Sequence, residues 1–333
     1  YCGSLKHIMF SEKSQLRIIG SKAFESCKFE SITIPPHVIE IHKQAFQNCK
    51  LKQLKFSDNS ELKIIHDEAF SYCSINVVQI PSSVIEIGER AFKNCNLVNV
   101  VFSENSNLQI IKKDAFRNNP LEFFIIPQSV TQFDESSDNF CDNLSYIFIN
   151  SNLSSSNTIN IPEKAQIISH NNLYKSEDDE YYLSFDFNDD EKTAKIKGLN
   201  IKKDFVAVPR SVNHNGNEYI VTEICNGAFE NSEIKIIYFP SDSEVQIIGE
   251  NSFAESPIHN IVIPSSVTQI CDNAFQSCQL KNVIFAQNSK ITSIGKNAFA
   301  NTLVEEIQIP PSAKQISTDA FSDCSSLKNI FFD

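Results

Sequence analysis

The chain has 333 residues, enough for two domains of ordinary size, and 41% of them are hydrophobic, as in a typical soluble protein. Its 41 Asp and Glu residues outnumber its 29 Lys and Arg residues, which gives a net charge of −12 at pH 7. Such a charge repels phosphate groups, so nucleic acid and anionic membrane surfaces are excluded as favoured partners.

No apolar stretch approaches the roughly 18 residues that a membrane-spanning helix needs, so we predict no membrane insertion. The first residues contain neither an initiator Met nor the apolar segment of a signal peptide. We therefore interpret the chain as a fragment of a longer protein.

An Ala-Phe landmark recurs along the chain at alternating steps of 22 and 24 residues. The landmarks of the first series are Phe24, Phe46, Phe70, Phe92 and Phe116, with a weaker copy at Phe140, and those of the second are Phe229, Phe253, Phe275, Phe299 and Phe321. Self-similarity at this period predicts a solenoid, because one short unit cannot bury its apolar side alone but stacked units share one core.

Each repeat predicts one coil of that solenoid. Leu54 and Phe56 alternate with polar residues, as expected of a short strand with one buried face. Leu62 and Ile65 then point back inside, and Ala69-Phe70 are expected on a single α- or 3₁₀-helical turn. The predicted fold class is therefore an α/β leucine-rich repeat solenoid, a right-handed superhelix with a parallel β-sheet on the concave side and short helical turns on the convex side.

The repeat resembles the BspA-like leucine-rich repeat family, whose pattern is Ile-x-Ile-Pro-x-Ser-Val-x-x-Ile-Gly-x-x-Ala-Phe-x-x-Cys. Residues 78–95 follow this pattern throughout, with Val78 in place of the first Ile. The resemblance covers most of residues 1–168 and 201–333. It implies a surface protein of mucosal bacteria or protist parasites that adheres to host cells or matrix proteins.

The repeat rhythm fails between the two series. Residues 181–187 and 193–197 alternate like two strands, and 188–191 would turn between them, which predicts a β-hairpin. We therefore expect a first repeat array over 1–168, a hairpin cap or insert over 169–200, and a second array over 201–333. The hairpin would either cover the first coil of the second array or bulge from one continuous solenoid.

Most of the ten cysteines follow the repeat, which bears on whether they form disulfides. Six of them lie three residues after a landmark Phe, at a position that holds Asn, Ser or Thr in other coils; these are Cys27, Cys49, Cys73, Cys95, Cys278 and Cys324. Cys225 and Cys271 replace the Gly of the pattern, and Cys141 falls outside both positions. The exchange with Asn, Ser and Thr predicts a ladder of buried, reduced thiols rather than disulfides.

Motifs for catalysis and metal binding are missing. The seven histidines are scattered, and His42 and His66, which occupy the Gly position, are predicted to lie on the surface. No nucleophile elbow, phosphate loop, zinc-protease motif or Cys-x-x-Cys pair is present. The acidic runs 177–180 and 189–191 lack the glycine and the spaced oxygen ligands of a calcium loop. We therefore predict no catalytic residue, no metal and no cofactor.

The outward side of the strands is the predicted partner-binding face. There the residues between the buried ones stack in columns about 4.8 Å apart. The apolar and aromatic members of these columns are Val77, Val101, Phe123, Ile125, Tyr146, Phe148, Tyr238, Val262 and Ile284. Contiguous exposed apolar surface commonly marks a protein interface, although strands favour such residues on any face.

The sequence thus predicts a non-catalytic scaffold that binds proteins. The resemblance implies an adhesin that docks host or matrix proteins through the concave sheet face, at the cell surface or outside the cell. One alternative is an intracellular interaction scaffold in the cytoplasm, which the reduced thiols favour. The other is a structural protein whose arrays associate with each other.

Overall fold

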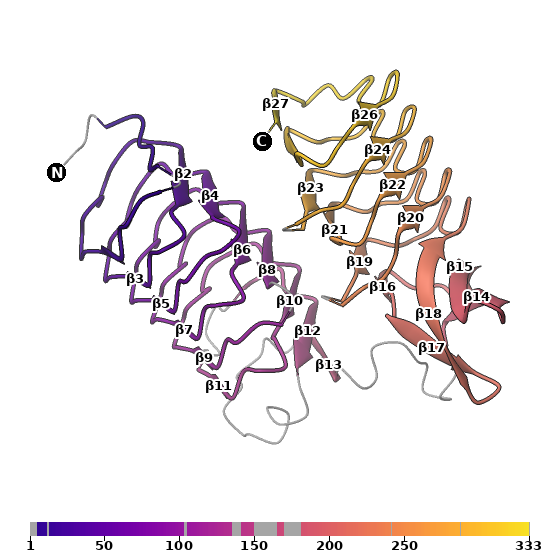
Figure 1. Cartoon of the computed structure of the whole chain (residues 1–333), viewed down its shortest axis with the longest axis horizontal. Coiled ribbons are helices and arrows are strands. Elements are labelled where there is room, and N and C mark those ends of the chain that lie inside the picture. The colour runs from indigo at the N-terminus through magenta and orange to yellow at the C-terminus, as the bar shows by residue number, and fades with distance from the viewer. Residues whose placement is uncertain are drawn as a thin grey trace. The chain divides into compact units, whose positions relative to one another are not determined.

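The computed structural model describes residues 5–11, 13–102, 105–134, 141–149, 165–169, 181–240, 242–286 and 288–332. The chain divides into two compact units, Tyr1–Asn172 and Leu173–Asp333 (Figure 1). Phe140 and residues 161–164, the first half of the partial repeat over 161–168, lie outside the described residues. The three-part organisation with boundaries at 168 and 200 stays a prediction.

In the first unit the coils contribute two series of strands, which form two walls (Figure 1). One wall consists of the longer strands β2 (Ser31–Ile34), β4 (Gln53–Phe56), β6 (Val77–Ile80), β8 (Asn99–Phe102), β10 (Phe123–Ile125), β12 (Tyr146–Ile149) and β13 (Gln166–Ser169). The other is a six-stranded sheet of the two-residue strands β1 (Ile18–Ile19), β3 (Glu40–Ile41), β5 (Ile64–Ile65), β7 (Glu86–Ile87), β9 (Ile110–Ile111) and β11 (Gln132–Phe133). Strands of neighbouring coils pair in parallel, as the solenoid prediction requires.

The second unit repeats this plan and begins with antiparallel strands. Its longer strands are β16 (Phe205–Ala207), β19 (Ile236–Tyr238), β21 (Asn260–Ile263), β23 (Asn282–Phe285), β25 (Glu306–Ile309) and β27 (Asn329–Phe332). The opposite sheet consists of β14 (Leu183–Asn188), β15 (Thr193–Leu199), β18 (Asn217–Ile224), β20 (Ile247–Ile248), β22 (Gln269–Ile270), β24 (Ser293–Ile294) and β26 (Gln315–Ile316), and β17 (Ser211–His214) pairs with β18.

The predicted hairpin is confirmed, because β14 and β15 pair antiparallel around a turn at residues 189–192. Strand β15 also pairs in parallel with β18, so the hairpin extends the sheet of the second unit at its first coil. The sequence prediction missed a second hairpin: β17 and β18 pair antiparallel across Asn215-Gly216, where only a resumption of the repeats was expected.

The expectation of helical turns is wrong: the structure places no helix within the part of the chain that it describes. In the first coil Lys22 and Ser26 have positive φ angles of 58° and 60°, and corresponding pairs recur in later coils. This conformation aims alternate N–H groups at the next coil, so that Phe24 donates to the carbonyl of Ala45 at 2.8 Å. Groups that bond between coils cannot form the i to i−4 bonds of an α-helix. The fold is a parallel-strand β-solenoid, and its handedness and curvature stay predictions.

The landmark phenylalanines form the centre of each unit, as predicted. Their rings stack from coil to coil with centroids 5.1–5.5 Å apart, from Phe24 to Phe116 and from Phe229 to Phe321. The rings of Phe46, Phe70 and Phe92 are fully buried. Every inner coil therefore contributes a ring that contacts a neighbour on both sides.

The cysteine ladder is confirmed for the described residues. None of the nine described cysteines forms a disulfide. Five of the six ladder thiols, from Cys49 onward, donate to the carbonyl of the landmark Phe one coil earlier, for example Cys49 to Phe24 at 2.9 Å and Cys95 to Phe70 at 3.0 Å. Asn119 at this position likewise donates to the carbonyl of Phe92 one coil earlier. The hydroxyls of Ser256 and Thr302 donate instead to the landmark Phe of their own coil. A small hydrogen-bond donor at this position therefore caps a landmark carbonyl in each of these coils, which explains why Asn, Ser or Thr can replace Cys.

Cys141, which was expected outside the ladder, belongs to it. Its thiol is buried and contacts the carbonyl of Phe116 at 3.6 Å. Cys141 follows Phe116 by 25 residues, the same separation as between Cys49 and Phe24. The sequence prediction counted the position of Cys141 from Phe140 in its own coil. It missed the ladder position because that position is defined by the distance to Phe116 in the preceding coil.

We expect the buried ladder thiols, such as Cys49, Cys95 and Cys278, to be unreactive in the folded protein. Burial raises the pKa of Cys49 and Cys95 to about 12 and that of Cys278 to about 11, and only the thiolate is nucleophilic. A disulfide-exchange reagent at pH 8 should therefore modify them only after unfolding. Unfolding without reductant should then release all ten thiols, and several missing thiols would contradict the ladder.

The same thiols should make stability fall in alkali. A group whose pKa is raised by folding stabilises the folded state below its unfolded pKa, which is about 8.5 for cysteine, and loses that contribution as pH rises towards the folded pKa. Urea midpoints should therefore decline between about pH 8.5 and 11. Cys95→Ser is the matched control, since Ser256 takes the same position in the second unit, and it should flatten this decline.

Candidate functional site

In the longer strands, buried and part-exposed residues alternate, as expected of a sheet with one solvent-exposed face. In β6, Val78 and Ile80 are buried, while Val77 and Gln79 are part exposed. The register Gln79↔Val101 places Val101 in the same column on the next strand. This outward side of the longer strands is called the long-strand face below.

Seven of the nine predicted binding residues lie part exposed on this face. In the first unit these are Val77, Val101, Ile125 and Tyr146, and in the second unit Tyr238, Val262 and Ile284. Val262 pairs directly with Ile284 between β21 and β23. The structure thus brings the predicted residues together within each unit on neighbouring strands.

The other two predicted residues, Phe123 and Phe148, are not exposed. The side chain of Phe123 is 7% exposed and that of Phe148 is fully buried. Their strands β10 and β12 lose the buried-exposed alternation, since three consecutive residues of β12 are buried. Both faces of the sheet are covered at these strands, so strand alternation does not expose the two rings there. Phe123 and Phe148 therefore do not belong to the proposed binding surface.

A polar pocket of about 160 Å³ lies over the turns of the first unit. It is lined by Glu68, Ser71, Tyr72, Arg90, Lys93 and Arg117. Arg90 pairs with Glu89 at 3.0 Å and Arg117 with the buried Asp114 at 3.3 Å. Carboxylates thus compensate the two guanidinium groups, and the pocket does not present a site for a particular ligand.

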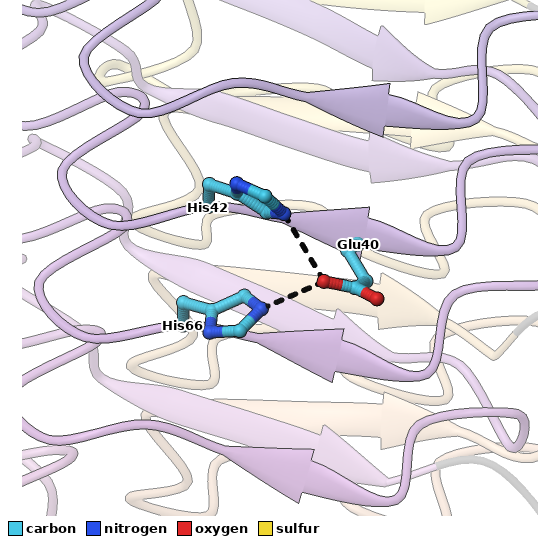
Figure 2. Close-up of side chains that lie close together, drawn as sticks. All are labelled: Glu40, His42 and His66. Carbon is cyan, nitrogen blue, oxygen red and sulfur yellow. Dashed lines mark hydrogen bonds and ion pairs between the residues drawn. The ribbon is translucent and has the colours of Figure 1, made fainter.

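The two-residue strands carry a cluster that sequence analysis missed. His42 and His66 come from neighbouring coils and both approach the carboxylate of Glu40, with hydrogen bonds of 3.1 and 3.0 Å (Figure 2). The hydrogen bond from His66 is the largest cause that holds the pKa of Glu40 below its usual value, and the bond from His42 adds to it. Sequence analysis predicts the two histidines only as separate surface residues. Their shared position in consecutive repeats is the sequence feature that indicates that they lie close together.

The backbone explains why side chains fit at the Gly position in these coils. A Cβ on Gly88 would lie 2.6 Å from the backbone nitrogen of Asp67, whose side chain accepts a hydrogen bond from the N–H of Glu89. Gly295 has the same relation to Asp272. Glycine is therefore required in a coil when the preceding coil has Asp or Asn directly after its own residue at the Gly position, as in His66-Asp67 before Gly88. The corresponding residues before His42 and His66 are Ser21 and Lys43, so both imidazoles are accommodated.

In the described part of the chain, no helix is long and apolar enough to cross a membrane. Comparison with curated proteins gives no significant match.

Several solved structures are similar to the chain at low sequence identity. The pneumococcal vaccine antigen PcpA is 20% identical, with a TM-score of 0.37 over 95% of this chain and 73% of that one. A leucine-rich repeat protein of T. pallidum is 22% identical, with a TM-score of 0.41 over 47% of this chain and 70% of that one. A leucine-rich cell surface protein of Faecalibacterium prausnitzii is 22% identical, with a TM-score of 0.32 over 96% of this chain and 83% of that one.

The family pattern described as a BspA type leucine rich repeat region, in six copies, matches residues 1–65, 63–177 and 222–333. These matched residues include both series of landmark phenylalanines and most of the strands described above. The chain belongs to the BspA-type leucine-rich repeat family.

Proposed function

We propose that this chain is a non-catalytic scaffold that binds a host or matrix protein at the cell surface. Membership of a repeat family with a scaffold architecture supports a role in protein interaction. The surface location and the adhesive role rest on the resemblance to BspA-like surface proteins. The partner would dock on the long-strand face, against a surface that the stacked coils keep rigid.

The row Tyr238, Val262 and Ile284 is the observation that supports this most directly. Val262 and Ile284 are paired, and Tyr238 lies two residues beyond the pair Ile236↔Asn260 on the preceding strand. All three are part exposed, although polar residues would suffice at these positions, as Gln308 shows on β25. Adjacent apolar and aromatic side chains of this kind are favoured anchors in protein interfaces.

The double variant Val262→Gln, Ile284→Gln should weaken binding to immobilised host matrix proteins at least tenfold, because it removes the apolar contact of the row. Thermal unfolding should change little, since Gln308 occupies an equivalent outward position. Surface plasmon resonance against a panel of purified matrix proteins measures the effect.

Ile110→Gln is the matched control for that experiment. It makes the same kind of change on the two-residue wall, where Gln132 is the register partner of Ile110. It should leave matrix binding unchanged. Equal binding by the double variant and the unaltered protein would refute docking through this row.

An intracellular interaction scaffold is the second candidate, and the thiols favour it. Cys49, Cys73 and Cys95 follow each other in consecutive coils and form no disulfide, as is usual in a reducing compartment. Fluorescence microscopy of the full-length parent protein distinguishes the two locations. Surface labelling would support the adhesive role, and exclusively internal signal would support the intracellular scaffold.

A further inference from the structure

A cluster of two imidazoles and one carboxylate lies on the outward side of the two-residue strands (Figure 2). Nε2 of His42 and Nε2 of His66 lie 3.1 and 3.0 Å from the same oxygen, Oε2 of Glu40. All three ligand atoms lie within 4.8 Å of one another. The side chains are 34–36% exposed, so an ion can reach them from solvent.

The backbone holds these three residues in place. Strands β3 and β5 pair in parallel with the register Glu40↔Ile64 and Ile41↔Ile65. The N–H of His42 donates to the carbonyl of Ile19, and that of His66 to the carbonyl of Ile41, each at 2.9 Å. Glu40 and His42, two residues apart, therefore point to the same side of one coil, and His66 takes the place of His42 one coil further. Glu40 lies on β3, and His42 and His66 directly follow β3 and β5, where backbone hydrogen bonds to the preceding coil fix them. The approach of the three ligands is therefore built into the fold.

We propose that Glu40, His42 and His66 bind a divalent transition-metal ion of the zinc class. Zinc lies about 2.0–2.1 Å from imidazole nitrogen and carboxylate oxygen, which places tetrahedral ligand atoms about 3.3 Å apart. The two nitrogen–oxygen separations of 3.1 and 3.0 Å are already close to that value. Small rotations of the two imidazoles would bring the third pair of ligand atoms, Nε2 of His42 and Nε2 of His66, to the same separation.

The donor set selects the class of ion. Two imidazole nitrogens suit zinc, cobalt, nickel or copper, whereas calcium and magnesium require oxygen ligands. Three protein ligands leave the fourth tetrahedral position to a water molecule. Because a carboxylate only accepts hydrogen bonds, each Nε2 carries a proton in the arrangement described here. Metal binding moves that proton to Nδ1, or releases it to solvent where the imidazole was charged.

The chain contains its own control for this site. His37 and Glu61 form a similar imidazole–carboxylate contact at 2.9 Å, between Nδ1 and Oε1. This pair is not part of a group of three converging ligand atoms among the described residues. A single imidazole with one carboxylate is a weak site for zinc, so loss of His37 should leave metal binding unchanged.

Isothermal titration of the intact chain with zinc chloride at pH 7.5, in the presence of a non-chelating reductant, tests the proposal. We expect one zinc ion per chain, and His42→Gln, His66→Gln and Glu40→Gln should each weaken its binding at least tenfold. His37→Gln should bind as the unaltered chain does.

Cobalt substitution distinguishes this site from binding at cysteines, because thiolates are also zinc ligands. Visible absorption of the cobalt-loaded chain should show nitrogen and oxygen ligation without a thiolate charge-transfer band. The double variant His42→Gln, His66→Gln keeps every cysteine and should lose the visible bands, while its circular dichroism in chelator matches that of the unaltered chain. Absence of zinc binding, a thiolate band, or unchanged affinity in the double variant would each overturn the proposal.

Discussion

Phe70→Ala should lower the free energy of unfolding of the first unit by about 3–5 kcal/mol, the usual cost of removing a buried aromatic ring. The ring of Phe70 is fully buried and stacks on Phe46 at 5.1 Å and on Phe92 at 5.2 Å. Its removal opens a cavity between two rings that the backbone hydrogen bonds between coils keep apart. Urea unfolding followed by circular dichroism measures the loss.

Phe24→Ala provides the comparison, because it makes the same substitution near the open end of the same stack. Phe24 is part exposed and stacks on one landmark ring only, that of Phe46 at 5.2 Å. Its loss should cost about half as much or less, since exposed atoms contribute little burial. Equal losses at Phe24 and Phe70 would show that stacking on both sides does not determine the stability of a coil.

The core was predictable because its signal is local and repeated. A spacing of 22 or 24 residues sets both the Phe stack and the cysteine ladder, and each new coil confirms the register of the last. The one error within the ladder, Cys141, arose where its position was measured from Phe140 instead of from Phe116 in the preceding coil. A solenoid position is thus defined by the coil before it as much as by its own neighbours.

The turns were not predictable from local preference. Lys22, Gln44 and Arg90 all adopt positive φ, a conformation that non-glycine residues rarely take and that costs energy by itself. Hydrogen bonds to the next coil stabilise it: those of Phe24 and Phe46 to the carbonyls of Ala45 and Ala69 are each 2.8 Å long. A single repeat lacks these bonds, so its sequence alone favours a helical turn.

The candidate sites also divide into residues that local alternation predicts and residues that depend on neighbouring coils. Part exposure of Val101, Val262 and Ile284 followed from strand alternation, whereas burial of Phe148 depends on what covers the outward face of β12. The cluster of Glu40 with His42 and His66 depends on the register between β3 and β5. The spacing of the two histidines indicates this register only after the coils are known to stack in parallel.

Asn119→Leu should destabilise the first unit by about 3–5 kcal/mol, because it leaves several buried backbone groups without partners at roughly 1–3 kcal/mol each. Asn119 is 2% exposed and occupies the ladder position. Its Nδ2 donates to the carbonyls of Phe92 and Phe116 at 2.9 and 2.7 Å. Its Oδ1 accepts from the N–H groups of Cys95 and Leu97 at 3.0 and 2.9 Å.

Thr302→Val is the matched substitution in the second unit, since Thr302 occupies the same position and is also buried. Its hydroxyl donates to the carbonyl of Phe299 at 2.8 Å, in its own coil, and contacts the thiol of Cys324 in the next coil at 3.3 Å. That change should cost only about 1–2 kcal/mol, since the usual net worth of a single hydrogen bond is about 1 kcal/mol. Urea unfolding of both variants gives the comparison. A loss at Asn119 no larger than that at Thr302 would mean that the amide does not hold the two coils together and that the Phe stack alone sets their spacing.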